Sequence, residues 1–452
     1  MKQPGRTGNM RIQLSDHFNY HRLLRFVLPS IIMMVFTSIY SVVDGLFVSN
    51  FAGKTAFAAV NLIMPVLMAL GAIGFLIGTG GSAVVSKTLG EGDKKTASQY
   101  FSMLVYVTIA VGILLTVVGQ IFLAPIAASL GAEGQMLEDC ILYGRILLTF
   151  QTAFMLQCAF QSFFVAAEKP KLGLGVTVAA GMTNIVLDAL FVGVFHWGIA
   201  GAAFATVISQ TVGGVFPIVY FLRKNDSLLH LTRAKLNLRV LLRVCANGSS
   251  ELMTNLSSSV MNILYNFQLM QFAGENGVAA FGVIMYVNFI FSAVYFGYAI
   301  GSAPVISYHY GAANHAELKN LFRKSLTITL CFGVAMLAFS ELLASPLAEL
   351  FVGYDRELYD LTCRGFRIYA LCFLFCGFSM FGSAFFTALN NGAVSAGISF
   401  LRMLVFQLIT ILTLPVLLGI DGVWLAIVVA ELMALAVTIF FFFFKRKQYH
   451  YA

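Results

Sequence analysis

The sequence predicts an all-α polytopic membrane protein with twelve transmembrane helices, arranged as two parallel six-helix lobes around a central cleft. Three observations predict it: an apolar composition, a one-sided distribution of basic residues, and an internal repeat. Of the 452 residues, 59% are hydrophobic and only 11% are charged, whereas a soluble protein carries about 25% charged residues. Runs such as 67–77 and 440–444 are apolar on both faces, unlike the alternating strands of a membrane β-barrel.

The apolar runs define twelve segments that are long enough to cross a bilayer. They are 26–50, 56–85, 97–123, 137–166, 172–194, 199–222, 241–272, 277–308, 320–343, 362–388, 393–417 and 422–444. The N-terminus is polar and basic as far as Arg25 and lacks a short apolar core with a small-residue cleavage site. We therefore expect the first run to be a true span rather than a removable signal peptide.

The basic residues fall almost entirely on one side of this arrangement. Both termini and the loops on their side hold 22 of the 28 Lys and Arg, the other side holds Lys54 and Arg356, and four lie in or beside spans. Because cytoplasmic loops are enriched in Lys and Arg, both termini are predicted to lie in the cytoplasm, with the protein in the cell membrane. The net charge of +8 then reflects topology and not nucleic-acid binding. The seven cysteines lack metal-site spacing and are expected to be reduced packing residues.

An internal repeat relates each position n of the first half to position n + 221 of the second. The segment 51–53 (Phe-Ala-Gly) recurs at 272–274, and the same offset relates Gly80 to Gly301, Gly90 to Gly311, Pro125 to Pro346 and Gly201 to Gly422. Since one repeat contains six spans, an even number, the two copies have the same orientation, as in parallel-repeat transporters. The predicted domains are an N-terminal lobe (1–222), a cytoplasmic linker (223–240) and a C-terminal lobe (241–452). The alternative is a duplicated bundle with no transport pathway.

Acidic residues inside spans are the best indication of function, because they are costly in lipid. Asp44 lies late in span 1, and Asn184 and Asp188 share one face of span 5 with Thr177 and Gly181. Further hydroxyls are offered by Tyr143 in span 4 and Thr206 in span 6. Two carboxyls in an apolar lobe form either a proton carrier or a small-cation site with Asp, Asn and Thr oxygens as ligands. The structural alternative is that each acid pairs with a basic group such as Arg145.

The second lobe does not copy this acid pair, because the offset maps Asp44 onto Tyr265 and Asp188 onto Ile409. Span 7 instead opens with Glu251, which is followed on one face by a polar stripe: Asn255, Ser258, Ser259, Asn262 and Asn266. This stripe is predicted to face water or substrate. Glu251 is then a second titratable group or a counter-charge for a cationic substrate, unless it reaches solvent near the span end. Glu341 and Glu431 are expected to be helix-end or packing acids, and Arg402 has no predicted role.

Several segments resemble the multidrug and toxic compound extrusion (MATE) family of transporters. They are 43–49 (VDGLFVS) with 56–60 and Pro65, the turn from 80 to 93, its second-lobe copy at 307–314, and 198–203 (GIAGAA). The resemblance implies ion-coupled efflux of organic cations. It places the ion site of prokaryotic members on Asp44, Tyr143, Asn184, Asp188 and Thr206, with a bending proline at Pro29. The second-lobe Glu of another branch falls on Glu251, but that branch's partner Asp is missing, because 367–389 contains no acid.

The function expected from the sequence is therefore a secondary active antiporter. It exports lipophilic, often cationic drugs in exchange for H⁺ or Na⁺ by alternating access, as a monomer, without a cofactor and with no metal beyond Na⁺ at the acid pair. The alternatives are a lipid or lipid-linked saccharide flippase of the same superfamily, or a major-facilitator protein. An intramembrane enzyme is disfavoured because no His lies mid-span as a base, and HExxH and P-loop motifs are absent.

Overall fold

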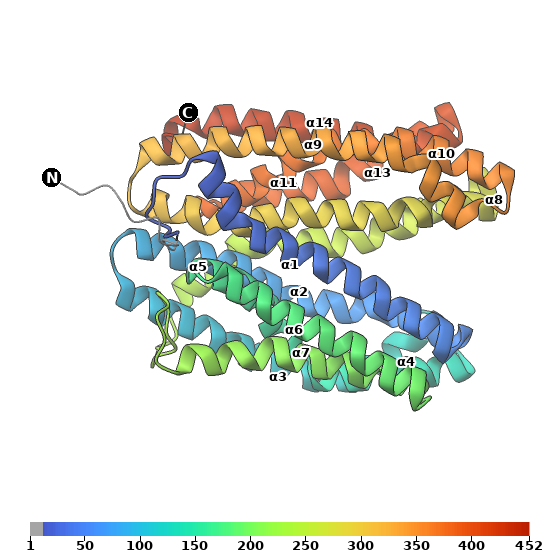
Figure 1. Ribbon diagram of the computed structural model, residues 1–452, viewed down its shortest axis with the longest axis horizontal. Helices are drawn as coiled ribbons and strands as arrows, with labels where there is room; N and C mark the ends of the chain where they lie inside the picture. The colour runs from blue at the N-terminus through green and yellow to red at the C-terminus, as the bar shows by residue number, and fades with distance from the viewer. Residues whose placement is uncertain (1–11, 452) are drawn as a thin grey trace.

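The computed structural model describes residues 12–451, apart from the side chains of residues 50 and 54, and within that range it contains helices and no strand. The first group is α1 (Tyr20–Phe47), the π-helix η1 (Val48–Ala52), α2 (Lys54–Gly90), α3 (Lys94–Ser129), α4 (Gly134–Thr149), α5 (Gln151–Ala166), α6 (Pro170–Asp188), the π-helix η2 (Ala189–Val194) and α7 (Gly198–Leu222). The second group is α8 (Leu238–Gly311), α9 (His315–Val352), α10 (Arg356–Ala370), α11 (Cys372–Ala388), α12 (Gly392–Phe400), the π-helix η3 (Leu401–Phe406), α13 (Gln407–Leu418) and α14 (Ile420–Tyr449). The two groups lie side by side in Figure 1 and are called the N-terminal and C-terminal lobes below. The basic residues of the first eleven positions lie outside the described range.

The predicted spans coincide with these helices, with ends that differ by a few residues. In the described chain, nine helices are long and apolar enough to cross a membrane, or eleven with two bent pairs counted as one span each. The longest, α8, has 74 residues, about 111 Å at 1.5 Å per residue, against a hydrocarbon core of about 30 Å. It breaks at Gly274, where φ is +58°, and the rings of Tyr265 and Phe281 stack at 5.6 Å across the turn. The boundary between predicted spans 7 and 8 is therefore confirmed, and the count of twelve stays a prediction.

Two predicted spans are broken rather than continuous. The segment 137–166 is divided between α4 and α5, which meet at 58°, and the segment 362–388 is divided between α10 and α11, which meet at 41°. The breaks fall at Phe150 and Leu371, two positions that the repeat offset relates. At the first break the hydroxyl of Thr149 donates to the carbonyl of Arg145 at 2.8 Å, a local bond that often bends helices. The sequence missed both breaks because neither carries a proline or glycine.

The buried apolar residues form three clusters that define where the lobes meet. One cluster lies wholly in the N-terminal lobe, between Val48 and Val207, and one wholly in the C-terminal lobe, between Met261 and Val428. The third contains residues of both lobes, including Val85, Phe221, Tyr298 and Phe442. It lies at the end of the bundle where α1 begins and α14 ends, on the left in Figure 1. The lobes thus share a core at that end and keep separate cores at the other.

Reciprocal glycine contacts close the shared end. A Cβ on Gly90 would lie 2.0 Å from the carbonyl oxygen of Tyr308, and a Cβ on Gly311 would lie 2.1 Å from that of Lys87. The repeat offset relates Gly90 to Gly311 and Lys87 to Tyr308, so the second contact is the first with the lobes exchanged. Two-fold symmetry requires this reciprocity. Ser307 also donates from Oγ to the carbonyl of Ala83 at 2.5 Å. Only residues without a side chain permit such close backbone approach.

Candidate functional site

Two carboxyl groups meet inside the N-terminal lobe. Asp44 lies one turn from the end of α1 and Asp188 is the last residue of α6, and the two helices pack together. The Asp44 side chain contacts those of Asp188 and Asn184. Asp188 and Asn184 are almost fully enclosed, with exposed fractions of 0% and 1%. The prediction that separate helices bring these three side chains together is correct.

Each of the two acidic helices continues into a π-helix. The π-helix η1 begins four residues after Asp44, η2 begins directly after Asp188, and the two π-helices contact one another. A π-helix accommodates an extra residue per turn and is frequently found at functional sites. Here the widened turns lie between the acid pair and the end of the bundle where the lobes have separate cores.

The acid pair has no basic partner among the described residues. Neither acid takes part in an ion pair there, and Arg145, the alternative partner considered from the sequence, is exposed. Within the described part of the chain, both oxygens of Asp188 and Oδ1 of Asp44 have no hydrogen-bond partner. Two facing carboxylates have only acceptors to offer each other. A proton or a cation between them resolves this conflict.

Two further hydroxyl groups surround the pair. Tyr143 of α4 is fully buried and contacts Thr206 of α7. It also interacts electrostatically with both acids. Neither hydroxyl forms a hydrogen bond of normal geometry with a described residue, and the same is true of Oδ1 of Asn184. The five predicted residues of the ion site therefore lie in one region: Asp44 contacts Asp188 and Asn184, and Tyr143, which interacts electrostatically with both acids, contacts Thr206. Their oxygens suit either a shared proton or a small cation such as Na⁺.

Within the described range there is no cluster of three or more His, Cys, Asp or Glu side chains that would suit a transition metal.

Sequence reasoning missed Tyr40 and Gln157 beside the site. Tyr40 lies one turn before Asp44 on α1, contacts Gln157 of α5 and interacts electrostatically with Asp44. The close approach of α1 to α6 at this level depends on Gly181, because a Cβ there would lie 2.5 Å from Phe36 and 2.9 Å from Tyr40. Thr177, which shares one face of α6 with Gly181, Asn184 and Asp188, is buried. It borders a small cavity together with Gln157. The identity of these neighbours follows from helix packing and has no signal in one sequence.

The predicted second-lobe stripe lies on the first half of α8. Asn255 and Asn262 are half-buried and exposed, respectively. Asn255 donates to the carbonyl of Glu251 at 2.8 Å, and Asn266 donates to that of Asn262 at 2.9 Å. Glu251 is half-buried and forms no ion pair with a described residue. It lies three residues beyond Gly248, where the lobes touch, since a Cβ on Gly248 would lie 2.0 Å from the carbonyl of Leu76. Glu251 therefore borders the closed end of the interface between the lobes.

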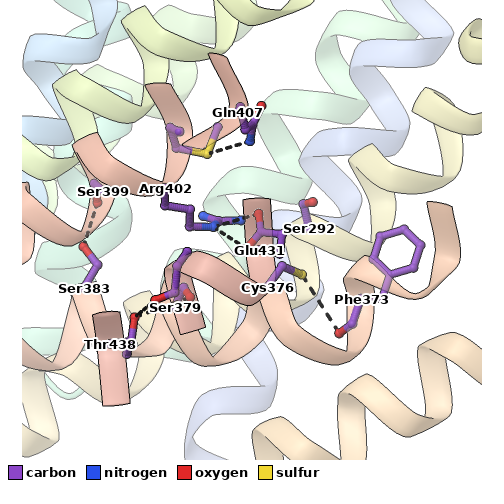
Figure 2. A network of polar contacts seen from close by, with 12 residues as sticks. Ser292, Phe373, Cys376, Ser379, Ser383, Ser399, Arg402, Gln407, Glu431 and Thr438 are labelled. Atoms are coloured by element: carbon purple, nitrogen blue, oxygen red, sulfur yellow. Dashed lines mark hydrogen bonds and ion pairs between the residues drawn. The ribbon is translucent and has the colours of Figure 1, made fainter. Parts of the chain in front are cut away.

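The structure corrects the expectation for Glu431 and gives Arg402 a partner. Nε of Arg402, on η3, donates to both carboxylate oxygens of Glu431, on α14, at 2.9 Å each. Figure 2 shows this pair with Cys376 and Ser292 around it. The side chains are 13% and 3% exposed. Glu431 is thus a buried counter-ion rather than a helix-end or packing acid. Glu341 lies near Arg367, with Arg367 Nε and Glu341 Oε2 3.7 Å apart, and both side chains are exposed.

Comparisons with known proteins decide the family. The MatE family model matches residues 29–190 and, again, residues 252–413, one match in each predicted lobe. The distance between the two starting residues is close to the repeat offset of 221 residues. The chain belongs to the MATE family. This match confirms the resemblance and supports the internal repeat.

Individual MATE relatives match over nearly the whole chain. The multidrug export protein MepA of Staphylococcus aureus (strain MSSA476) is 24% identical over 421 residues, which cover 92% of each chain. A structure described as the outward-facing conformation of a multidrug resistance MATE family transporter superposes with a TM-score of 0.92, at 24% identity, over 99% of this chain and 100% of that one. A transporter from Pyrococcus furiosus, described as having a binding pocket of reverse polarity that suggests a different function, gives a TM-score of 0.88 at 24% identity over 98% of both chains. The predicted all-α, two-lobe MATE fold is confirmed.

Proposed function

We propose that this MATE protein is a secondary active antiporter that exports lipophilic, often cationic drugs in exchange for H⁺ or Na⁺. The observation that carries the proposal is the contact between Asp44 and Asp188 without a basic partner among the described residues. A carboxyl pair of this kind binds one positive charge more favourably than none, because mutual repulsion and the apolar surroundings both oppose double ionisation. The relatives named for multidrug export support the drug substrates.

The distribution of the cores supports alternating access. The lobes share buried residues at the end that carries the predicted cytoplasmic loops, and they have separate cores at the other end. With the termini in the cytoplasm, the acid pair lies in the outward half of the N-terminal lobe. A cation that enters from outside then neutralises the pair and changes how α1 packs against α6. Pro29 is the proposed hinge, because it interrupts the hydrogen bonds of α1 where that helix meets α8.

The substrate is proposed to bind between the lobes and to leave outward when α1 moves. Glu251 and the polar stripe with Asn255 and Asn262 supply a negative charge and amide groups for a cationic drug. The alternative function is a lipid or lipid-linked saccharide flippase, which the Pyrococcus furiosus relative with reverse pocket polarity keeps open. An anionic lipid substrate needs cationic groups in the cleft, whereas predicted spans 1 and 7 carry acids and amides.

The test is drug efflux from proteoliposomes in which a pH gradient or a Na⁺ gradient is imposed separately. The wild type is expected to respond to one of them. Asp44→Asn and Asp188→Asn should each reduce efflux to the rate without a gradient, because a neutral amide holds no exchangeable cation. Glu275→Gln is the matched control, since Glu275 is exposed at the turn between the halves of α8. Undiminished gradient-driven efflux in both Asp variants contradicts the proposal, and lipid translocation without drug efflux supports the flippase.

A further inference from the structure

A basic groove lies between α3 and the linker that joins the lobes. Its volume is about 680 Å³, and it is lined by Gln99 and Tyr100 of α3 together with residues 233–239. Those residues include three cations, Arg233, Lys235 and Arg239, all of which are exposed. None of the three side chains forms an ion pair or hydrogen bond with any residue in the range 12–451. The groove therefore presents three uncompensated positive charges.

The linker is held in an extended path along α3. The backbone N–H of Thr232 donates to Oγ of Ser102 at 2.8 Å, and the hydroxyl of Tyr106 donates to the carbonyl of Thr232 at 3.1 Å. Further along, the N–H of Asn237 points to Sδ of Met103 at 3.2 Å. The segment between these anchors carries Arg233 and Lys235, and Arg239 follows in the first turn of α8. Figure 1 shows the linker in yellow-green beside the ends of α7 and α3.

The length of α3 is the argument that places the groove near the membrane surface. The helix α3 has 36 residues, about 54 Å at 1.5 Å per residue, and so projects beyond a hydrocarbon core of about 30 Å. Gln99 and Tyr100 are five and six residues from its start, which is about 8 Å along the axis and within the projecting part. A tyrosine at this depth is typical of the interface between lipid and water.

Exposed leucines alternate with the basic residues. Leu236 and Leu238 are 69% and 62% exposed, and Leu242 on the first turns of α8 is 61% exposed. In the extended segment, Lys235 and Leu236 point to opposite sides, and Leu238 and Leu242 lie about one turn apart on one face of α8. The linker thus offers apolar side chains to a hydrocarbon phase and cations to an adjacent polar layer. Water-filled surroundings alone do not favour three large exposed leucines within seven residues.

We propose that this groove binds the phosphate headgroup of an anionic phospholipid. The three cations contact the headgroup, and the flanking leucines insert beside its acyl chains. Positive juxtamembrane clusters attract anionic lipids, and the hydrophobic contact distinguishes a lipid from a soluble anion. The linker joins the two lobes and must accommodate their relative motion. A lipid bound in the groove therefore contacts this connecting segment directly. The proposal concerns binding and does not depend on which ion or drug is transported.

The experiment measures binding of phosphatidylglycerol and of phosphatidylcholine to the purified full-length protein by native mass spectrometry. The wild type should bind phosphatidylglycerol more tightly. The variant R233Q/K235Q/R239Q should weaken this binding by about tenfold or more, since each cation contributes separately. The charge-matched control K319Q/R323Q/K447Q removes three cations from the predicted same side, outside the groove, and should change binding less than about twofold.

Two further arms keep the outcome decisive. R233K/R239K keeps the charges and should bind as the wild type does, which separates charge loss from misfolding, and thermal unfolding checks each variant. L236S/L238S should weaken phosphatidylglycerol binding while all cations remain. Equal binding of the two lipids, or wild-type binding by the triple Gln variant, overturns the proposal. Displacement of the lipid by millimolar inorganic phosphate also overturns it, because the groove would then recognise a soluble anion.

Discussion

Arg402 and Glu431 form a buried ion pair in which one nitrogen, Nε, donates to both carboxylate oxygens at 2.9 Å. The internal offset places the pair on the two C-terminal spans that correspond to spans 5 and 6, which carry Asn184, Asp188 and Thr206 in the other lobe. Arg402 lies three residues before the position equivalent to Asn184, and Glu431 lies four residues after that of Thr206. Each shift is about one helical turn. Because consecutive spans run in opposite directions, both shifts move the residue toward the same end of the bundle. The C-terminal lobe therefore holds an ion pair near the level where the N-terminal lobe holds two acids with no basic partner among the described residues.

Removal of one member of this pair should be strongly destabilising. Arg402→Met leaves the Glu431 charge buried, which typically costs about 3–5 kcal/mol. The double variant R402M/E431L should recover most of that loss, because no charge remains. The free energy of unfolding, measured by denaturant titration in mixed micelles, tests this with a double-mutant cycle. Arg356→Met is the control, since its pair with Asp360 is exposed and such pairs contribute about 0–1 kcal/mol. An equal effect of both single variants contradicts the interpretation.

Gly181 should control how α1 lies against α6. In Gly181→Ala the new methyl meets rings of Phe36 and Tyr40 at 2.5 and 2.9 Å, so α1 must shift, and Asp44 lies one turn further along it. We expect reduced gradient-driven efflux in a protein that still folds. Gly175→Ala is the matched control, because it lies on the same helix with open space around its Cβ position and gains the same helix propensity. Efflux that falls equally in both variants would point to a general effect of alanine on α6.

Closure of the shared end should depend on Gly90 and Gly311. A methyl at either position would lie about 2 Å from a backbone oxygen of the other lobe, and backbone cannot rotate away as a side chain can. Gly90→Ala and Gly311→Ala should therefore increase the distance between spin labels at K95C and R323C, measured by electron–electron double resonance. Gly282→Ala, which has no atom within 4 Å of its new methyl, should leave that distance unchanged. Unaltered distances in the first two variants would show that this end does not rely on backbone contact.

The predicted orientation is tested by labelling of single cysteines in a variant without the seven native ones. Tyr354, between α9 and α10, is 84% exposed, and Arg323 is exposed on α9 near the opposite end of that helix. With both termini in the cytoplasm, a membrane-impermeant maleimide should label Y354C in intact cells. It should label R323C only after permeabilisation. The reverse pattern would show that the basic side faces outward and that the positive-inside interpretation is wrong.

The predictions that depend on local properties of the chain agree with the structure. Helix positions follow from apolar runs, and the break at Gly274 falls between the predicted segments 241–272 and 277–308. The first-lobe acids were identified because an ionised group in lipid is costly wherever it lies. The partner of Arg402 was missed because Glu431 is 29 residues away and no periodicity links the two. The bends at Phe150 and Leu371 were missed because neither break carries a proline or glycine that would interrupt a helix.

The sequence by itself determined the order of the apolar segments and the repeat, and it predicted the number of spans, their sidedness and the acids at which a coupling ion would bind. These properties depend on hydrophobicity and charge summed along the chain, and summation does not require contacts. The tertiary structure decided that Asp44 faces Asp188 without a basic partner among residues 12–451, while Glu431 faces Arg402. It also decided that the linker and α3 enclose a basic groove. These relationships depend on which helix faces turn toward each other. Close packing around residues such as Gly181 sets the rotation of each helix about its axis, and it does so only when both helices are in place.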